Sequence, residues 1–165
     1  SAYPTIYPTS GKFYFEKITT TANSWISLGI NRISDSTSYG LYSSYFTPYL
    51  LGNTDWSNNS ASNATSYQTP GSVISMAMDL DNRAIWFAKD GVWIDGNGSE
   101  SSATVLAQMI AGNTSSAAFT WSSSITDVRM YSRDRGCISH TNFGQRPWTY
   151  TPPTGFKALN TYNLP

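Results

Sequence analysis

Between residues 72 and 94 the hydrophobic residues recur at every second position, which is the period of a β-strand. The pattern is interrupted at Asp81-Asn82 and again at Lys89-Asp90-Gly91, and Asp-Gly between two apolar runs is typical of a tight hairpin. The stretch therefore predicts an antiparallel meander of three strands, the first two at the heart of the core. In the first strand, one face carries Val73, Ser75, Ala77 and Asp79, and the other carries Ile74, Met76, Met78 and Leu80.

Similar short alternating runs occur along the rest of the chain. Residues 105–110 fit either a strand or a single helical turn, and residues 156–159 can pair at a sheet edge. About ten short strands without an amphipathic helix predict an all-β fold, a two-sheet antiparallel β-sandwich. The further strands are expected at residues 12–18, 24–30, 117–121, 127–131 and 137–143.

Residues 31–71 interrupt this pattern with a long polar stretch. Apart from a short possible strand at residues 39–42 they are expected to be loop, with one or two short edge strands. The whole chain, 1–165, is expected to be a single domain. Residues 1–9 are an extended lead-in and residues 149–165 a C-terminal extension. Because the chain starts at Ser1 rather than Met, we expect a mature product or a module of a longer protein.

Composition excludes several partners. The formal net charge is zero, and only 12% of residues are charged, so no broad attraction to nucleic acid is predicted. No apolar run approaches the roughly 18–20 residues of a membrane span, so membrane insertion is not expected. A single cysteine, Cys137, excludes an intrachain disulfide. The abundance of Ser, Thr, Asn, Gly and Tyr is common in secreted, viral-surface and adhesive β-proteins.

Signals for catalysis are weak. His140 is the only histidine, and strand alternation separates it from Cys137. A sandwich glycosidase needs two carboxylates across a cleft, but the chain has only two glutamates, Glu16 and Glu100. Asp79 lies at a predicted hairpin, where a turn-stabilising role is expected. We therefore predict that the protein is not an enzyme.

One loop could in principle hold a metal ion. Residues 95–100 bring Asp95, Asn97, Ser99 and Glu100 close together, and such oxygen ligands suit Ca²⁺. The loop lacks the glycine and the distal glutamate of an EF-hand, so ordinary loop chemistry is favoured. No metal and no cofactor is predicted.

Four separated segments together resemble one family. Residues 10–16 (SGKFYFE) resemble a strand of SPRY (B30.2-like) domains, and residues 25–30 resemble the strand that follows. Residues 71–91 resemble the central hairpin of that family, with Ser72 and Asp90 in place of its usual Asp and Asn. Residues 141–148 (TNFGQRPW) resemble its closing segment, and the residues after 150 resemble the end of SPRY modules in bacteriophage structural proteins.

The resemblance implies a concanavalin-like jelly-roll sandwich and an interaction module, generally without catalysis, that binds partners through loops at one end. The residues themselves indicate where such binding would occur. Tyrosines set among Ser, Asn, Gly and Thr make large amphipathic contacts at low entropic cost, and aromatic faces beside Asn and Asp suit sugar rings. The predicted ligand-binding residues are Tyr39, Tyr42, Tyr45, Tyr49, Asp55, Trp56 and Tyr67.

These observations favour a non-catalytic binding module at the surface of a phage virion, in a tail fibre or similar component. Its expected partners are a host-surface glycan or protein and other virion subunits, with a homo-oligomer such as a trimer possible. The alternative is a structural, assembly or capsid-decoration module whose aromatic residues pack against neighbouring subunits. A glycan hydrolase is a third, least favoured interpretation.

Overall fold

The computed structural model describes residues 6–21, 25–34, 38–44, 48–51, 56–58, 70–96 and 101–160. For residues 25–26, 38–44, 48–51, 56–58 and 135 it describes the backbone alone. The strands are β1 (Lys12–Thr21), β2 (Trp25–Arg32), β3 (Ser38–Ser44), β4 (Pro48–Leu51), β5 (Trp56–Asn58), β6 (Val73–Asp79), β7 (Ala84–Lys89), β8 (Val92–Ile94), β9 (Phe119–Trp121), β10 (Val128–Arg135) and β11 (Ile138–Asn142). One helix, α1, spans Ser102–Ile110.

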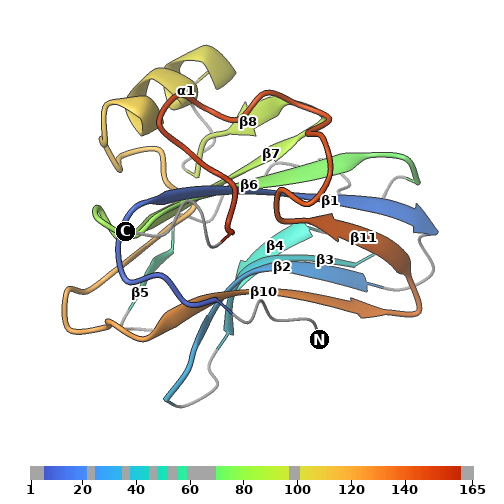
Figure 1. Cartoon of the computed structure of the whole chain (residues 1–165), viewed down its shortest axis with the longest axis horizontal. Helices are drawn as coiled ribbons and strands as arrows, with labels where there is room; N and C mark the ends of the chain where they lie inside the picture. The colour runs from blue at the N-terminus through green and yellow to red at the C-terminus, as the bar shows by residue number, and fades with distance from the viewer. Residues whose placement is uncertain are drawn as a thin grey trace.

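The strands form two antiparallel sheets stacked as the layers of a sandwich (Figure 1). The larger sheet has the order β11-β1-β6-β7-β9-β5, with β8 also paired to β7. The smaller sheet has the order β10-β2-β3-β4. The predicted all-β sandwich is confirmed. The described residues form eleven strands, where the sequence indicated about ten.

The main core lies between the two sheets. It is built from alternate residues of facing strands, as the period-two pattern predicts. From the larger sheet β1 contributes Phe15 and β6 contributes Met76, while the smaller sheet contributes Leu28 and Met130. Each of these side chains is at most 1% exposed. The face of β6 predicted to be apolar, from Ile74 to Leu80, therefore packs against the second sheet.

The opposite face of the larger sheet is also buried, which the alternation pattern did not predict. Tyr14, Ala77 and Trp86 form a second apolar cluster there with Val105 of α1 and Phe156 of the C-terminal segment. In Figure 1, α1 and this segment lie over the outer side of the sheet. Small residues such as Ala77 made this face look solvent-exposed in the sequence. In the fold they leave room for the covering elements to pack closely.

The absence of an amphipathic helix was a wrong prediction. Helix α1 begins after Ser101, whose side chain caps it by accepting a hydrogen bond from the Thr104 backbone N–H. Only two of its residues, Val105 and Met109, are buried, at the i, i+4 spacing of one helix face. Because two buried residues in a helix of nine give little periodicity, the sequence alone does not decide whether residues 105–110 form a strand or a helical turn.

Both predicted hairpins of the meander are present. Asp90 and Gly91 have φ values of 50° and 79°, the double positive φ of a type I′ turn between β7 and β8. In the β6–β7 turn, Asp79 accepts hydrogen bonds from the backbone and side-chain nitrogens of Asn82, at 2.9 and 2.8 Å. Asp79 also pairs with Lys12, 3.0 Å away. These contacts agree with the turn-stabilising role expected for Asp79.

Three local predictions need a correction or a comment. In residues 31–71, β3 covers the possible strand at 39–42, and β4 and β5 are two short edge strands, as predicted. Cys137 lies just before β11 rather than within a strand, partly buried against the main core. Lys157 pairs with the N-terminal half of β1, where its N–H reaches the Lys12 carbonyl at 3.0 Å. Only Lys157 of residues 156–159 forms a bridge, and β1 is an inner strand of the larger sheet, so the predicted pairing at a sheet edge is not what the structure shows.

Candidate functional site

The structure places only part of the predicted tyrosine-rich site. Tyr45, Asp55 and Tyr67 lie outside the described residues. The backbone positions of Tyr39 and Tyr42 are on β3, that of Tyr49 is on β4, and that of Trp56 is on β5.

The strand register brings two of these positions together. Tyr42 is directly opposite Tyr49 on the neighbouring strand. Tyr39 is three residues from Tyr42 along β3, so strand alternation assigns its position to the other face of the sheet. Trp56 belongs to the larger sheet, where it is opposite Trp121. Of the four described positions, only Tyr42 and Tyr49 are therefore direct neighbours in a sheet.

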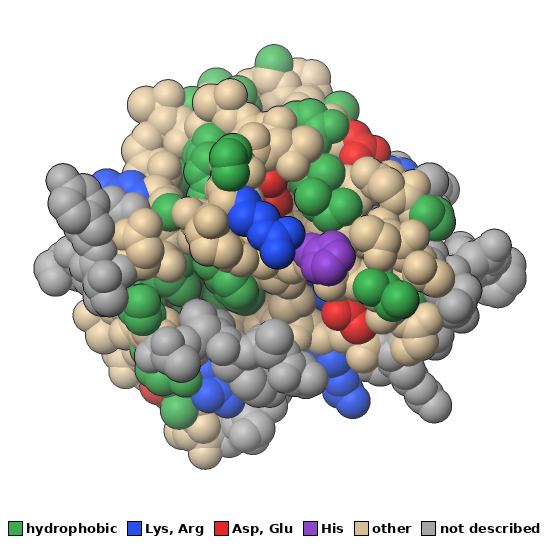
Figure 2. All heavy atoms as spheres, turned by 45° about the vertical axis from the view of Figure 1, so that its right-hand side comes forward, with side chains coloured by type: hydrophobic (Ala, Val, Ile, Leu, Met, Phe, Trp, Pro, Cys, Tyr) green, Lys and Arg blue, Asp and Glu red, His purple; other side chains and the backbone are tan. Residues whose placement is uncertain are grey.

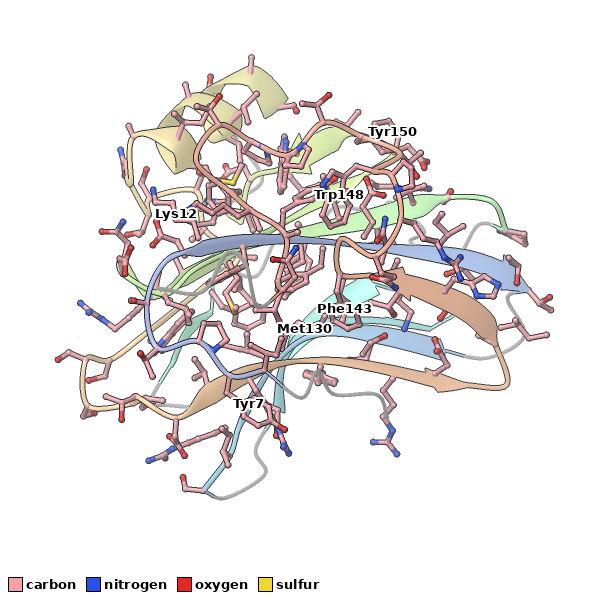
Figure 3. All side chains as sticks on the ribbon, viewed as in Figure 1. Tyr7, Lys12, Met130, Phe143, Trp148 and Tyr150 are labelled. Atoms are coloured by element: carbon pink, nitrogen blue, oxygen red, sulfur yellow. The ribbon has the colours of Figure 1, made fainter. Side chains whose placement is uncertain are left out.

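A second candidate site was not predicted from the sequence. A groove of about 620 Å³ lies on the outer side of the larger sheet, between the sheet, α1 and the C-terminal segment. Figure 3 shows Trp148 and Tyr150 on this segment, above the sheet. The floor is formed by Tyr14, Ser75 and Ala88, one wall by Trp93, Ser102 and Leu106, and the other wall by Tyr150, Pro152 and Thr154.

A buried carboxylate fixes the second wall. Glu16, on β1, is completely buried, and its two oxygens accept the backbone N–H groups of Thr149 at 2.9 Å and Tyr150 at 2.8 Å. The hydroxyl of Tyr14 also lies 3.0 Å from Oε1 of Glu16. In the described part of the chain no cation pairs with Glu16. Two backbone amides and a phenol therefore stabilise its negative charge.

The floor of the groove holds a tyrosine that stays protonated. Burial raises the pKa of the Tyr14 hydroxyl above its ordinary value, and the negative charge of the adjacent Glu16 adds to the increase. The hydroxyl is 2.8 Å from Oγ of Ser75, which also lines the groove. Tyr14 thus links the floor of the groove to the carboxylate that holds its wall.

The walls are rigid for local reasons. A Cβ at Gly91 would lie 2.6 Å from the Tyr150 ring, so the absence of a side chain lets this ring pack on the β7–β8 turn. The backbone N–H of Trp93 donates to Ser102 Oγ at 2.8 Å, which ties β8 to the start of α1. One signal in the sequence could have indicated the groove. Residues 148–153 (WTYTPP) combine two aromatic residues with a Pro-Pro pair at the start of the predicted C-terminal extension.

The remaining candidates for chemistry are dispersed. His140 is exposed on β11, and Figure 2, where it is purple, shows Lys or Arg and Asp or Glu side chains scattered over that face. Lys17 is fully buried and pairs with Asp134 at 2.8 Å. Burial lowers the pKa of the Lys17 ammonium group, while Asp134 opposes that shift. Within the described ranges, no group of three or more His, Cys, Asp or Glu side chains could hold a metal ion.

The helix and the comparisons with known proteins give no direct indication of function. Within the described ranges, α1 is too short to cross a bilayer, and no other helix is present there. The chain matches no protein-family model, and a search of curated proteins finds no significant match.

Proposed function

We propose that the chain is a non-catalytic binding module at the surface of a phage virion, in a tail fibre or similar component. It recognises a host-surface glycan or protein through the region of residues 35–67. The observation that carries this proposal is the pairing of Tyr42 with Tyr49. Directly opposed residues have Cβ atoms about 4.5–5.5 Å apart, so two tyrosines at such positions belong to one surface.

The position of this pair in the sheet supports a binding role. Strand β4 is the outermost strand of the smaller sheet as described, so Tyr49 is at its edge. The pair also adjoins long polar segments rich in Ser, Asn and Thr. Binding residues are often found on loops that a scaffold of strands positions.

The segments that resemble SPRY domains serve the framework itself. The Gly11 N–H donates to Asp81 at 2.9 Å, joining the start of β1 to the β6–β7 turn. The side-chain amide of Asn142 donates to the carbonyls of Arg146 and Pro147, both at 3.2 Å. Because these residues are used in turns and tethers, the resemblance supports a sandwich scaffold that leaves recognition to its loops.

A binding assay with matched variants tests the proposal. Fluorescently labelled protein is applied to a panel of bacterial cells and to their purified surface polysaccharides and outer-membrane proteins. We expect the Tyr42→Ala/Tyr49→Ala variant to lose binding, and Tyr7→Ala, which removes a tyrosine that is 45% exposed and outside this region, to keep it. A double variant that binds as strongly as the wild type would refute the site.

The second candidate is a structural or assembly module that packs against neighbouring virion subunits. It is favoured by the edge strands β4 and β5, because exposed sheet edges can pair with another chain. In this case the tyrosine pair would be buried between copies, for example in a trimer. Loss of self-association in the Tyr42→Ala/Tyr49→Ala variant would support this candidate over host recognition.

A further inference from the structure

We propose that the groove between α1, β8 and residues 150–154 is a binding site for an uncharged saccharide of one or two sugar rings. This site is on the outer side of the larger sheet, whereas Tyr42 and Tyr49 belong to the smaller sheet. It is therefore independent of the host-recognition surface proposed above.

The charge of the lining sets the class of ligand. The residues that line the groove include no Asp, Glu, Lys, Arg or His, and the nearby Glu16 already has three hydrogen-bond donors. An anionic ligand would find no cation there, and a cationic ligand would find no carboxylate free to pair with it. A neutral ligand avoids both desolvation costs.

Two aromatic side chains that line the groove provide donors without a partner in the part of the chain that the structure describes. Neither the indole N–H of Trp93 nor the hydroxyl of Tyr150 has a hydrogen-bond partner among the described residues. Trp93 lines the groove with 8% of the residue exposed, so its indole N–H can take an acceptor from a ligand that enters. A ligand with oxygen atoms in the groove would supply one.

The rest of the lining matches a sugar ring. The C–H groups of a sugar ring can pack against the apolar Leu106 and Pro152, and against the ring of Tyr150. Ser102 and Thr154 add hydroxyls, which can donate to or accept from the hydroxyls of a sugar. A cavity of about 620 Å³ is within the usual range for small-ligand sites.

The site is organised before the ligand arrives. Glu16 holds the backbone at Thr149 and Tyr150, and Gly91 lets the Tyr150 ring pack in one orientation. Binding therefore does not have to order this wall, which lowers its entropic cost.

An NMR titration of the full chain tests the assignment. The indole N–H resonance of Trp93, identified by its loss in Trp93→Phe, is followed while neutral saccharides built from glucose, galactose or N-acetylglucosamine are added. Sialyl-lactose serves as the anionic probe and polyproline as the peptide probe. We expect a neutral saccharide to shift this resonance saturably, with sialyl-lactose binding at least about tenfold more weakly.

Variants locate the contact. Tyr150→Phe keeps the ring and removes only the free hydroxyl, so it should weaken binding by about 3- to 10-fold without changing stability. Tyr42→Ala/Tyr49→Ala should bind these saccharides as the wild type does, which separates this site from the host-recognition surface. The assignment is overturned if no neutral saccharide moves the Trp93 resonance at millimolar concentration, if only polyproline moves it, or if Tyr150→Phe binds unchanged.

Discussion

Replacing Glu16 with glutamine tests how the C-terminal segment is held on the sheet. In the wild type, one carboxylate oxygen accepts the Thr149 N–H at 2.9 Å, and the other accepts the Tyr150 N–H at 2.8 Å. A glutamine has one oxygen and one NH₂ group in the same places. Whichever way the amide is turned, one backbone N–H faces another donor. Rotation of the Tyr14 hydroxyl cannot relieve this conflict.

The contacts of Glu16 set the size of the expected loss in the free energy of unfolding. An unsatisfied buried N–H costs about 1–3 kcal/mol, and the loss of charge assistance in the remaining bonds adds about 0.5–1.5 kcal/mol. The lower desolvation cost of a neutral amide offsets part of this sum. We therefore expect Glu16→Gln to lower the free energy of unfolding by about 2–4 kcal/mol, and Tm by about 5–15 °C for a chain of this size.

Urea denaturation followed by tryptophan fluorescence and circular dichroism measures this change. The matched control is Asp81→Asn, because exposed Asp81 accepts a single N–H, from Gly11, which an amide oxygen can also accept. That variant should be within about 0.5 kcal/mol of the wild type. If Glu16→Gln is equally close to the wild type, the buried carboxylate does not hold the segment and the reasoning is refuted.

Three further predictions concern the framework. Gly144→Ala should destabilise the fold by about 2–5 kcal/mol in a thermal or urea melt, because φ is 104° and the new Cβ would overlap that of Ala158. Burial raises the pKa of Tyr14, so above about pH 10 the folded state keeps a proton that the unfolded state loses. The free energy of unfolding should therefore fall as pH rises above about 10, and it should fall less steeply in Tyr14→Phe. Asp134→Asn should lower the free energy of unfolding in a urea melt by about 1–3 kcal/mol, because it leaves the buried Lys17 without its ion-pair partner. This is less than the cost of breaking a fully buried pair, because Asp134 is partly exposed.

Each of these predictions has a comparison that can contradict it. Gly71 has a φ of 88° and no atom within 4 Å of an added Cβ, so Gly71→Ala should lower the free energy of unfolding only by the backbone strain, about 1–2 kcal/mol. If Gly144→Ala lowers it by the same amount, the overlap with Ala158 contributes nothing and the steric argument is wrong. Identical alkaline slopes for Tyr14→Phe and the wild type would contradict the Tyr14 linkage. A Lys17→Met/Asp134→Asn variant should be more stable than Asp134→Asn alone, and no recovery would contradict the ion-pair argument.

Local chemistry explains which parts of the fold the sequence predicts. The β7–β8 turn follows from Asp90-Gly91, since both residues adopt positive φ, and the two faces of β6 follow from strict alternation between residues 73 and 80. These features depend on neighbours in the chain. The additional strands in residues 31–71 are harder to predict, because short strands such as β5 are defined by pairing with distant ones such as β9.

The groove depends on contacts that no local pattern encodes. Glu16 is 133 positions from Thr149 in the sequence and reads there as an ordinary polar residue on an alternating strand. Trp93 reads as a core residue, although its indole N–H has no acceptor in the described structure. Helix α1 gives little periodicity. The aromatic and proline residues at 148–153 indicate a contact surface, but the sequence does not show that this segment and α1 form the two walls of one groove.

The central claim is that the chain is a recognition module and not a subunit contact. Sedimentation equilibrium of the 165-residue chain over a wide concentration range tests it most directly. We predict a monomer for the wild type and an unchanged monomer for Tyr42→Ala/Tyr49→Ala, which leaves the paired tyrosines available to an external ligand. A stable trimer that the same double substitution dissociates would contradict the claim and place these tyrosines between subunits.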